Sequence, residues 1–127
     1  MFNRAVSGVY PPGSVFKPLV AIAAIESNSI DTSTVIEDTG KLSVGAFSFA
    51  NWFFTQYGRT DGLVDLKKAL ARSNDIYFYK VGEMTKVEVI SEWGKKFGFG
   101  QKTGIQLSHE AEGIMPDREW RKKIKNQ

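Results

Sequence analysis

Cysteine is absent from this chain of 127 residues, and histidine occurs only once. The lack of cysteine excludes a disulfide framework, a thiolate metal site and a cysteine nucleophile. Long apolar runs are also absent, because the longest one, Leu19 to Ile25, is far shorter than the ~20 residues that cross a bilayer. The N-terminus lacks the basic-then-apolar layout of a signal peptide. We therefore expect any membrane anchor or export signal to lie outside this chain.

Excess charge of one sign is small and confined to one end of the chain. There are 17 basic and 14 acidic residues, and the net charge is +3. The segment 116–127 has five basic and two acidic residues, so the rest of the chain is neutral. A nucleic-acid binder usually carries a basic stripe across a folded face. We therefore expect no nucleic-acid partner and interpret the basic end as a solvated helix or a cut end.

The pattern of apolar and turn residues predicts one mainly helical domain. A chain of this length, 42% hydrophobic, can bury roughly two thirds of the surface that it exposes when unfolded. Turn residues and apolar periodicity predict helices over residues 14–27, 64–72, 76–84 and 86–97 and a last helix after Pro116. They also predict a hairpin or two short strands within 34–53, with a turn at 38–40, and a loop and short strand in "GFGQKTGIQL". In the helix over 86–97 the expected core stripe is Val87, Ile90, Trp93, Gly94 and Phe97.

The predicted first helix has two unusual features. Its body, "PLVAIAAI", is apolar on nearly every side, as in a helix buried all round. Pro18 has no N–H group, so the carbonyl of Ser14 loses its usual helical partner and the first turn becomes locally special.

Ser14 and Lys17 form an S-x-x-K pair at the start of this helix. With ten serines and twelve lysines, random placement gives about one such match in an ordinary composition, so the pattern alone decides nothing. Residues three apart on a helix share a face, so Lys17 can reach the Ser14 hydroxyl, and apolar neighbours would favour its uncharged, basic form. A helix N-terminus would also stabilise an oxyanion at the serine. The alternative is that Ser14 caps the helix and Lys17 extends to solvent.

A second polar element is "ARSNDIYFYKVG". Ser73, Asn74 and Asp75 form a turn between two predicted helices, and such a turn can hold a hydroxyl and a hydrogen-bonding group beside the start of another helix. The alternative is that Ser73 or Asp75 only caps the following helix.

Taken together, these stretches resemble the transpeptidase domain of class B penicillin-binding proteins, especially the elongation type. The matching segments are "NRAVSGVYPPGSVFKP", "FANW", "GLVDLKKALARSNDIYFYKVG" and "EWGKKFGFGQKTGIQL", in that order, with later E, G, P and W residues up to Trp120. The resemblance implies an α/β (α+β) fold of the serine D,D-peptidase and β-lactamase type, of which the part present is mainly helical with a short hairpin.

The resemblance also implies the chemistry. Ser14 would be the nucleophile acylated by the D-Ala-D-Ala end of a peptidoglycan stem peptide, and β-lactams would acylate the same serine. Lys17 would activate Ser14, and Ser73 would pass a proton toward the leaving amine. Asp75 stands where many relatives have asparagine, and elongation-type members similarly have an acid there.

The same resemblance implies further properties of the whole protein. It needs no cofactor or metal, other cell-elongation proteins are its partners, and its place is the extracytoplasmic face of the bacterial inner membrane.

The third motif of this superfamily is lysine, threonine or serine, then glycine, and "KTG" at Lys102 matches it by letters. We reject this match, because it follows Ser73 too closely and lies in a stretch that resembles a loop of the family. The expected third-motif strand would come after Gln127. We therefore interpret residues 1–127 as a partial transpeptidase domain that is inactive as an isolated fragment.

Three alternatives to a transpeptidase segment differ in the residues that they require. His109 lies in "LSHEAEG", a polar turn, where an exposed histidine is expected rather than the base of a Ser-His-Asp triad. A β-lactamase or β-lactam sensor would share S-x-x-K, although "YPPGSVFKP" and the "NW" stretch favour the biosynthetic enzyme. A scaffold fragment without catalysis is the alternative from another class.

Overall fold

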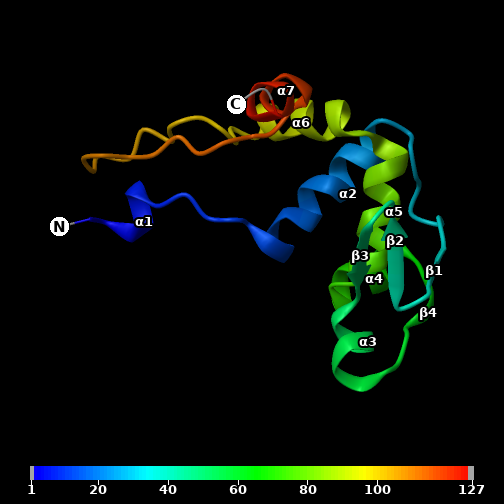
Figure 1. Cartoon of the computed structure of the whole chain (residues 1–127). Coiled ribbons are helices and arrows are strands. Elements are labelled where there is room, and N and C mark those ends of the chain that lie inside the picture. Colours follow the sequence, from blue (N-terminus) through cyan, green and yellow to red (C-terminus); the bar gives the residue numbers. More distant parts are fainter. Residues whose placement is uncertain (1, 126–127) are drawn as a thin grey trace.

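The computed structural model describes residues 2–125 of the chain. Its central part consists of helices packed beside two small sheets, and an extended arm projects from it (Figure 1). In chain order the helices are α1 (Arg4–Ser7), the 3-10 helix η1 (Gly13–Phe16), α2 (Lys17–Glu26), α3 (Trp52–Tyr57), α4 (Leu66–Arg72), α5 (Asp75–Thr85), α6 (Val87–Lys96) and α7 (Arg118–Lys125). The strands are β1 (Ile36–Asp38), β2 (Lys41–Val44), β3 (Phe47–Ala50) and β4 (Gly62–Val64).

The hydrophobic core lies between α2 and α5, with α4, α6 and β4 around it. Its buried members are Val20, Ala21, Ala24, Ile30, Val64, Leu66, Ala69, Tyr77, Phe78 and Val81. The alanines of α2 are short, so its neighbours approach its backbone closely. As predicted, α2 is buried on most sides, although Ile22 remains 38% exposed. This core fixes the starts of α2 and α5 relative to each other.

The first turn of the predicted helix is a 3-10 turn, and its cause is Pro18. Because Pro18 cannot donate to the carbonyl of Ser14, that carbonyl instead accepts the N–H of Lys17, one residue earlier. The α-helix proper then begins at Lys17 with Pro18 in its first turn, a position that tolerates proline. The chain therefore tightens between Ser14 and Lys17.

The predicted hairpin exists, but its turn lies elsewhere. β2 pairs with β3 in antiparallel register, Lys41 opposite Ala50 and Val44 opposite Phe47, so the turn includes Gly45. Residues 38–40 instead connect two separate sheets, because β1 pairs with β4. Residues 38–40 join the strands β1 and β2, but they do not form the turn of the hairpin. Gly40 and Gly45 both have positive φ angles, and the sequence alone does not say which of these two glycines lies in the hairpin turn.

Other predicted boundaries need small corrections. The segment "TDG" leads into β4, and α4 begins only at Leu66, after Asp65 accepts the N–H of Lys68 as the N-cap. Residues 52 and 53 begin α3 rather than ending a strand. In α6, Gly94 is buried, but Val87 and Phe97 at its two ends are exposed, because the core covers only the middle of this helix.

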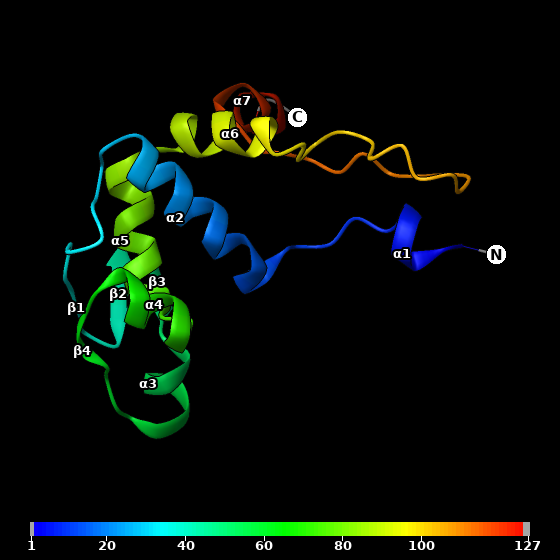
Figure 2. The same ribbon diagram turned by 180° about the vertical axis from the view of Figure 1, so that it is seen from behind.

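The arm pairs the N-terminal segment with the chain between α6 and α7. Figures 1 and 2 both show α1 and the residues after it running beside this later segment. The Ala111 N–H donates to the Val6 carbonyl at 2.9 Å, and the Ser7 hydroxyl donates to the His109 carbonyl at 2.7 Å. The short strand predicted in "GFGQKTGIQL" was wrong: residues 98–116, all described, contain no strand. The N–H groups of Thr103 and Gly104 in this stretch donate to the Glu110 carboxylate instead of to a neighbouring strand.

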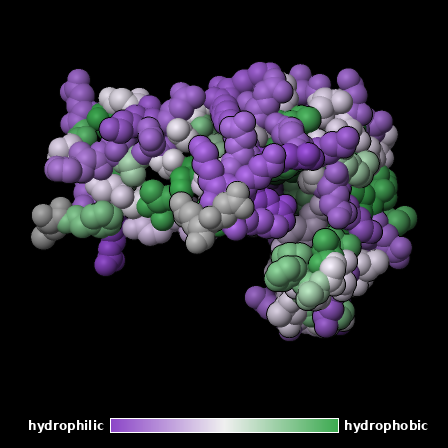
Figure 3. Space-filling model, turned by 45° about the horizontal axis from the view of Figure 1, so that its top comes forward, coloured by the Kyte–Doolittle hydropathy of each residue, from purple (hydrophilic) through white to green (hydrophobic). Residues whose placement is uncertain are grey.

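The last helix begins near the predicted position, with Arg118 as its first residue. Hydrophilic side chains gather over α6 and α7 in the middle of Figure 3. Lys95 of α6 pairs with Asp117 at 2.8 Å, and Arg118 pairs with Glu88. The basic residues of α7 are exposed, as expected for a solvated helix.

Between residues 2 and 125, none of the helices is long and apolar enough to cross a membrane.

Candidate active site

Lys17 is the centre of the candidate site. Its Nζ lies 3.2 Å from Ser14 Oγ, 2.9 Å from Ser73 Oγ, 2.8 Å from the Ser73 carbonyl oxygen and 2.6 Å from Asp75 Oδ1. The lysine side chain is only 12% exposed, and its amino group lies 5.9 Å from the centre of the Phe78 ring. Lys17 therefore contacts each of the other three residues predicted from the sequence, although 56 to 58 residues separate it from Ser73 and Asp75.

The Ser14 hydroxyl faces the second polar element. Ser73 Oγ lies 3.0 Å from Ser14 Oγ, so the two hydroxyls and the amine form a closed triangle of hydrogen bonds. Ser14 itself is exposed. Neither η1 nor α2 has a side-chain cap. The alternative that Ser14 serves as a helix cap therefore has no support from the geometry.

The Ser73 turn is held in a conformation that non-glycine residues seldom adopt. Ser73 ends α4 with φ 51° and ψ 45°, in the left-handed region. Asn74, not Ser73 or Asp75, caps α5, because its side chain accepts the N–H of Tyr77 at 2.9 Å. The side chain that caps α5 therefore belongs to Asn74, which lies between the two candidates Ser73 and Asp75. The side chains of Ser73 and Asp75 contact Lys17 instead.

Residues of α3 secure both sides of this turn. The Trp52 indole N–H donates to the carbonyl of Arg72 at 2.8 Å, directly before Ser73. The Asn51 side-chain oxygen accepts the N–H of Asp75 at 3.3 Å, directly after Asn74. The guanidinium of Arg72 lies 4.9 Å from the centre of the Trp52 ring. The "NW" pair therefore fixes the backbone of the turn from two directions.

Buried polar residues lie behind the turn, and we call Asp38, Asn51, Asp61 and Asn74 the Asp38 cluster. Asp38, Asn51 and Asn74 are 2%, 0% and 0% exposed. Burial by itself raises the pKa of the Asp38 carboxyl, but the hydrogen bonds that it accepts from N–H groups and side-chain amides outweigh burial and hold this pKa below its usual value. Asp38 is therefore a buried carboxylate whose charge is stabilised by hydrogen bonds.

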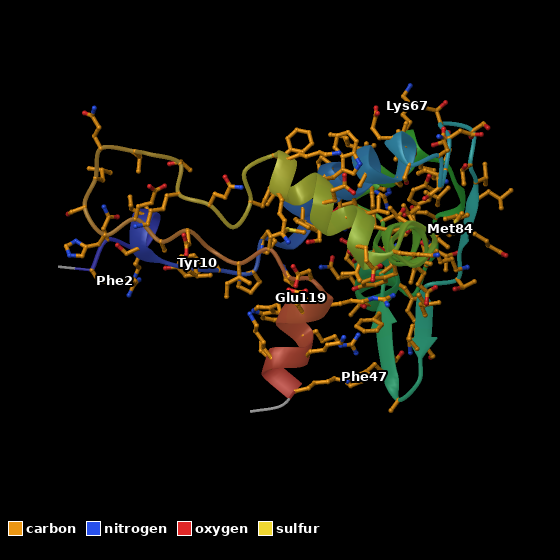
Figure 4. All side chains as sticks on the ribbon, turned by 90° about the horizontal axis from the view of Figure 1, so that it is seen from above. Phe2, Tyr10, Phe47, Lys67, Met84 and Glu119 are labelled. Atoms are coloured by element: carbon orange, nitrogen blue, oxygen red, sulfur yellow. The ribbon has the colours of Figure 1, made fainter. Side chains whose placement is uncertain are left out.

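An aromatic pair lies next to Asp75. Tyr79 follows Asp75 by one turn of α5, and the Phe49 ring of β3 packs 5.0 Å from the Tyr79 ring. Burial, and secondarily the charge of Asp75, raise the pKa of the Tyr79 hydroxyl. The hairpin β2–β3 thus contributes one wall beside the site, with Phe47 near its turn (Figure 4).

The segment between α6 and α7, which contains Lys102 and His109 in the sequence, forms part of the arm and extends away from α2 and α5 (Figures 1 and 4). The Thr103 N–H and hydroxyl each donate to Glu110 Oε1 at 2.6 Å, and the Gly104 N–H donates to Glu110 Oε2. The N–H groups of Thr103 and Gly104 are thus bound by a nearby carboxylate and are not displayed on a strand. His109 is exposed, with φ 64°, as in the polar turn expected for it.

In the part of the chain that the structure describes, no cluster of three or more His, Asp or Glu side chains is placed to hold a metal ion. The chemistry that the four contacting residues can supply is proton transfer and nucleophilic attack. A hydroxyl in contact with an amine and a second hydroxyl is the arrangement of an activated serine. The fold and the geometry of this site are compatible with the class of active-serine acyl-transfer domains.

Comparisons with known proteins agree with this class. The family description "Penicillin binding protein transpeptidase domain" matches residues 1–127. The peptidoglycan D,D-transpeptidase MrdA of Acinetobacter baumannii is 39% identical over 123 residues, which cover 95% of this chain and 18% of that protein. MrdA of Escherichia coli K12 is 38% identical over 125 residues, covering 97% and 19%. The chain therefore spans about a fifth of the length of these relatives.

Solved structures of the same family superpose closely. The penicillin-binding protein PBP2 from Helicobacter pylori matches with a TM-score of 0.88 and 38% identity, covering 99% of this chain and 23% of that one. The same protein in a complex with MreC matches with a TM-score of 0.87 and 37% identity, over 99% and 23% of the two chains. This chain belongs to the penicillin-binding protein transpeptidase family, in its elongation-type class B branch.

The fold expected from the resemblance is confirmed, and the part described is mainly helical with a short hairpin. Asp38, Asn51 and Trp52 support the site, and none of them is predicted to do so from the sequence. "FANW" was noticed only as a matching segment, and Asp38 only as a turn residue. The sequence around Asp38 does not indicate that this residue is buried, because an aspartate two residues before a glycine is also typical of an exposed turn.

Proposed function

We propose that this chain supplies the acylating half of a peptidoglycan D,D-transpeptidase, with Ser14 as the nucleophile. The observation that carries the proposal is the meeting of Ser14, Lys17 and Ser73 within 3.2 Å of one another. The name of the MrdA relatives, peptidoglycan D,D-transpeptidase, supports the substrate class, stem peptides ending in D-Ala-D-Ala.

The geometry supports a definite order of proton transfers. The resting site holds Lys17 as an ion pair with Asp75, and the reaction starts from the form in which Lys17 has released a proton to solvent. In that form Nζ takes the hydroxyl proton of Ser14 while Oγ forms a bond to the carbonyl carbon of the penultimate D-alanine. The proton then passes to the amine of the terminal D-alanine through the Ser73 hydroxyl, which contacts both Ser14 Oγ and Lys17 Nζ. Free D-alanine leaves, and an amine of a neighbouring stem peptide takes the acyl group from Ser14.

Asp75 has the role of holding the lysine. Its carboxylate accepts a hydrogen bond from Lys17 Nζ at 2.6 Å, and Asp75 is the first residue of α5. The first turn of a helix favours a negative charge there. Asp75 therefore orients the amine without being placed to contact the substrate.

The relatives support a proposal for the location and partners of the whole protein. A PBP2 of 37% identity has been solved as a complex with MreC, which supports a cell-elongation partner of that kind. A D,D-transpeptidase acts where stem peptides are cross-linked, so its location is the extracytoplasmic face of the bacterial inner membrane. β-Lactams that imitate D-Ala-D-Ala acylate the same serine.

Covalent labelling by a fluorescent penicillin tests the proposal. Because the chain spans about a fifth of its relatives' length, labelling is measured on the chain within a complete transpeptidase domain as well as on the chain alone. Ser14→Ala should abolish the label and Ser73→Ala should mostly slow it, because Ser73 relays a proton and forms no bond to the substrate.

Ser33→Ala is the matched control, because Ser33 is an exposed serine whose partner is Asp31, and it should label at the parent rate. Label that persists on the Ser14→Ala protein, located on another residue by mass spectrometry, would refute the assignment. Retention of the label over hours fits a transpeptidase, whereas its rapid hydrolysis would indicate a β-lactamase.

A further inference from the structure

Asp38 is not one of the four contacting residues of the site, yet its carboxylate accepts four hydrogen bonds. Its Oδ1 accepts the Gly40 N–H at 2.8 Å. Its Oδ2 accepts the Asp61 N–H, the Asn51 side-chain amide and the Asn74 side-chain amide, each at 2.9 Å. A buried carboxylate with this many donors is rigidly placed, because moving it would leave several donors unpaired.

Two of these donors continue directly into the Ser73 turn. Asn51 donates to Asp38 through Nδ2 and accepts the Asp75 N–H through Oδ1. Asn74 donates to Asp38 through Nδ2 and accepts the Tyr77 N–H through Oδ1. In each amide the nitrogen faces Asp38 and the oxygen faces the backbone of α5, so the carboxylate also determines which way each amide is oriented.

Asp61 completes the cluster on the other side. Its Oδ2 shares the Asn74 amide at 3.1 Å, and its Oδ1 accepts the Arg72 guanidinium at 3.1 Å. Arg72 is also the residue whose carbonyl receives the Trp52 indole N–H. The residues immediately before and after Ser73 are therefore both tied to buried carboxylates.

We propose that Asp38 is a positioning residue of the active site, which acts through Asn51 and Asn74 to hold the Ser73–Asp75 turn against Lys17. The inference rests on the proposed function, because it assigns Asp38 to the acylation of Ser14. Three of the four close contacts of Lys17 Nζ come from this turn. A turn that shifts by about 1 Å would misplace Ser73 Oγ for proton transfer, and such shifts can cost roughly 100-fold in rate.

The test combines an acylation assay with hydrogen exchange. Asp38→Asn keeps the shape of the side chain but replaces one acceptor oxygen by a donor, so it cannot satisfy all four of its present donors. Acylation by a fluorescent penicillin, within a complete transpeptidase domain, is resolved into its noncovalent dissociation constant and its first-order acylation rate constant. We expect the rate constant to fall about 10- to 100-fold, with the dissociation constant changed less than about threefold.

Two control variants separate positioning from lost stability or lost charge. Thr85→Val removes a buried hydroxyl that binds the Val81 carbonyl at the far end of α5, so it destabilises the fold without touching the turn. Asp65→Asn removes a carboxylate but keeps the capping oxygen of α4. Both should acylate within about twofold of the parent. Asn74→Ser retains an N-cap for α5 but cannot reach Asp38, and serves as the second variant if Asp38→Asn does not fold.

Amide exchange in the 127-residue chain gives a readout that needs no activity. In Asp38→Asn the amides of Asp75 and Tyr77 should exchange at least about tenfold faster, while the Ile90 amide of α6 keeps its rate. An acylation rate constant equal to that of the parent, or equal losses in Asp38→Asn and Thr85→Val, would overturn the proposal. Absence of labelling in the parent protein would instead refute the proposed function. If, in addition, the Asp75 amide of Asp38→Asn exchanged at the parent rate, the role of Asp38 in holding the turn would be refuted as well.

Discussion

Replacing Asp75 by asparagine removes the charge that faces Lys17 while keeping an oxygen that can accept its hydrogen bond. The two side chains are 12% and 27% exposed, and their charged atoms are 2.6 Å apart. At an effective dielectric constant of about 20, the gross attraction is about 6 kcal/mol. The cost of desolvating both groups offsets most of this attraction. The hydrogen bond that the asparagine oxygen still accepts from Lys17 further reduces the loss of stability. We expect a net loss of about 1–2 kcal/mol in the free energy of unfolding.

Urea denaturation at pH 7 measures this loss, and thermal unfolding should show a melting temperature lower by roughly 4–8 °C. The control is Asp117→Asn, which breaks the exposed Lys95–Asp117 pair but keeps the oxygen that accepts the Trp120 N–H. Its effect should be smaller and should fade with added salt, whereas the Asp75→Asn effect should persist. Equal losses in the two variants, or none for Asp75→Asn, would show that the Lys17–Asp75 contact does not stabilise the fold.

Two further predictions concern residues away from Lys17. Lys102→Ala should leave acylation within a few-fold of the parent, because "KTG" lies on the arm; a loss of about 1000-fold, on the scale of a deleted base or oxyanion donor, would show that our rejection of this motif is wrong. The folded-state pKa of Asp38 is lowered, so its contribution to stability is present above its unfolded pKa, about 3.9, and is lost as the pH falls through the folded pKa. Denaturation from about pH 5 down to about pH 2 should therefore show less acid sensitivity in Asp38→Asn, and an unchanged pH profile would contradict the stabilised carboxylate.

Helix positions were predictable because apolar periodicity and caps are local signals. The helices α2, α5 and α6 begin and end within a few residues of their predicted bounds, and α7 begins close to its predicted start. The strands were less predictable, since β1 and β4 are three residues long and their pairing joins segments 26 residues apart. Pairing of such short strands depends on which neighbours the core supplies, and no local pattern contains that information.

The site was predictable in its members but not in its support. Ser14, Lys17, Ser73 and Asp75 follow from helix spacing and from the family resemblance, and the structure brings all four together. The Asp38 cluster could not be predicted, because its residues come from four separate segments that are polar and turn-like in sequence. Burial changes their role from solvated turn residues to a shared hydrogen-bond network, and burial is a property of the whole fold.

The distance along the chain between the two halves of the site has a consequence for folding. Ser14 and Ser73 are 59 residues apart, and closing a flexible loop of that length costs about 3.6 kcal/mol of entropy, apart from a constant. The contact between Ser14 and Ser73 is too weak to offset this entropy by itself, so it forms only when α2 and α5 pack together. During synthesis, Ser14 emerges well before Ser73 and behaves as an ordinary alcohol. Reactivity toward penicillin would therefore report that this part of the chain has folded, and could serve as a probe of its refolding rate.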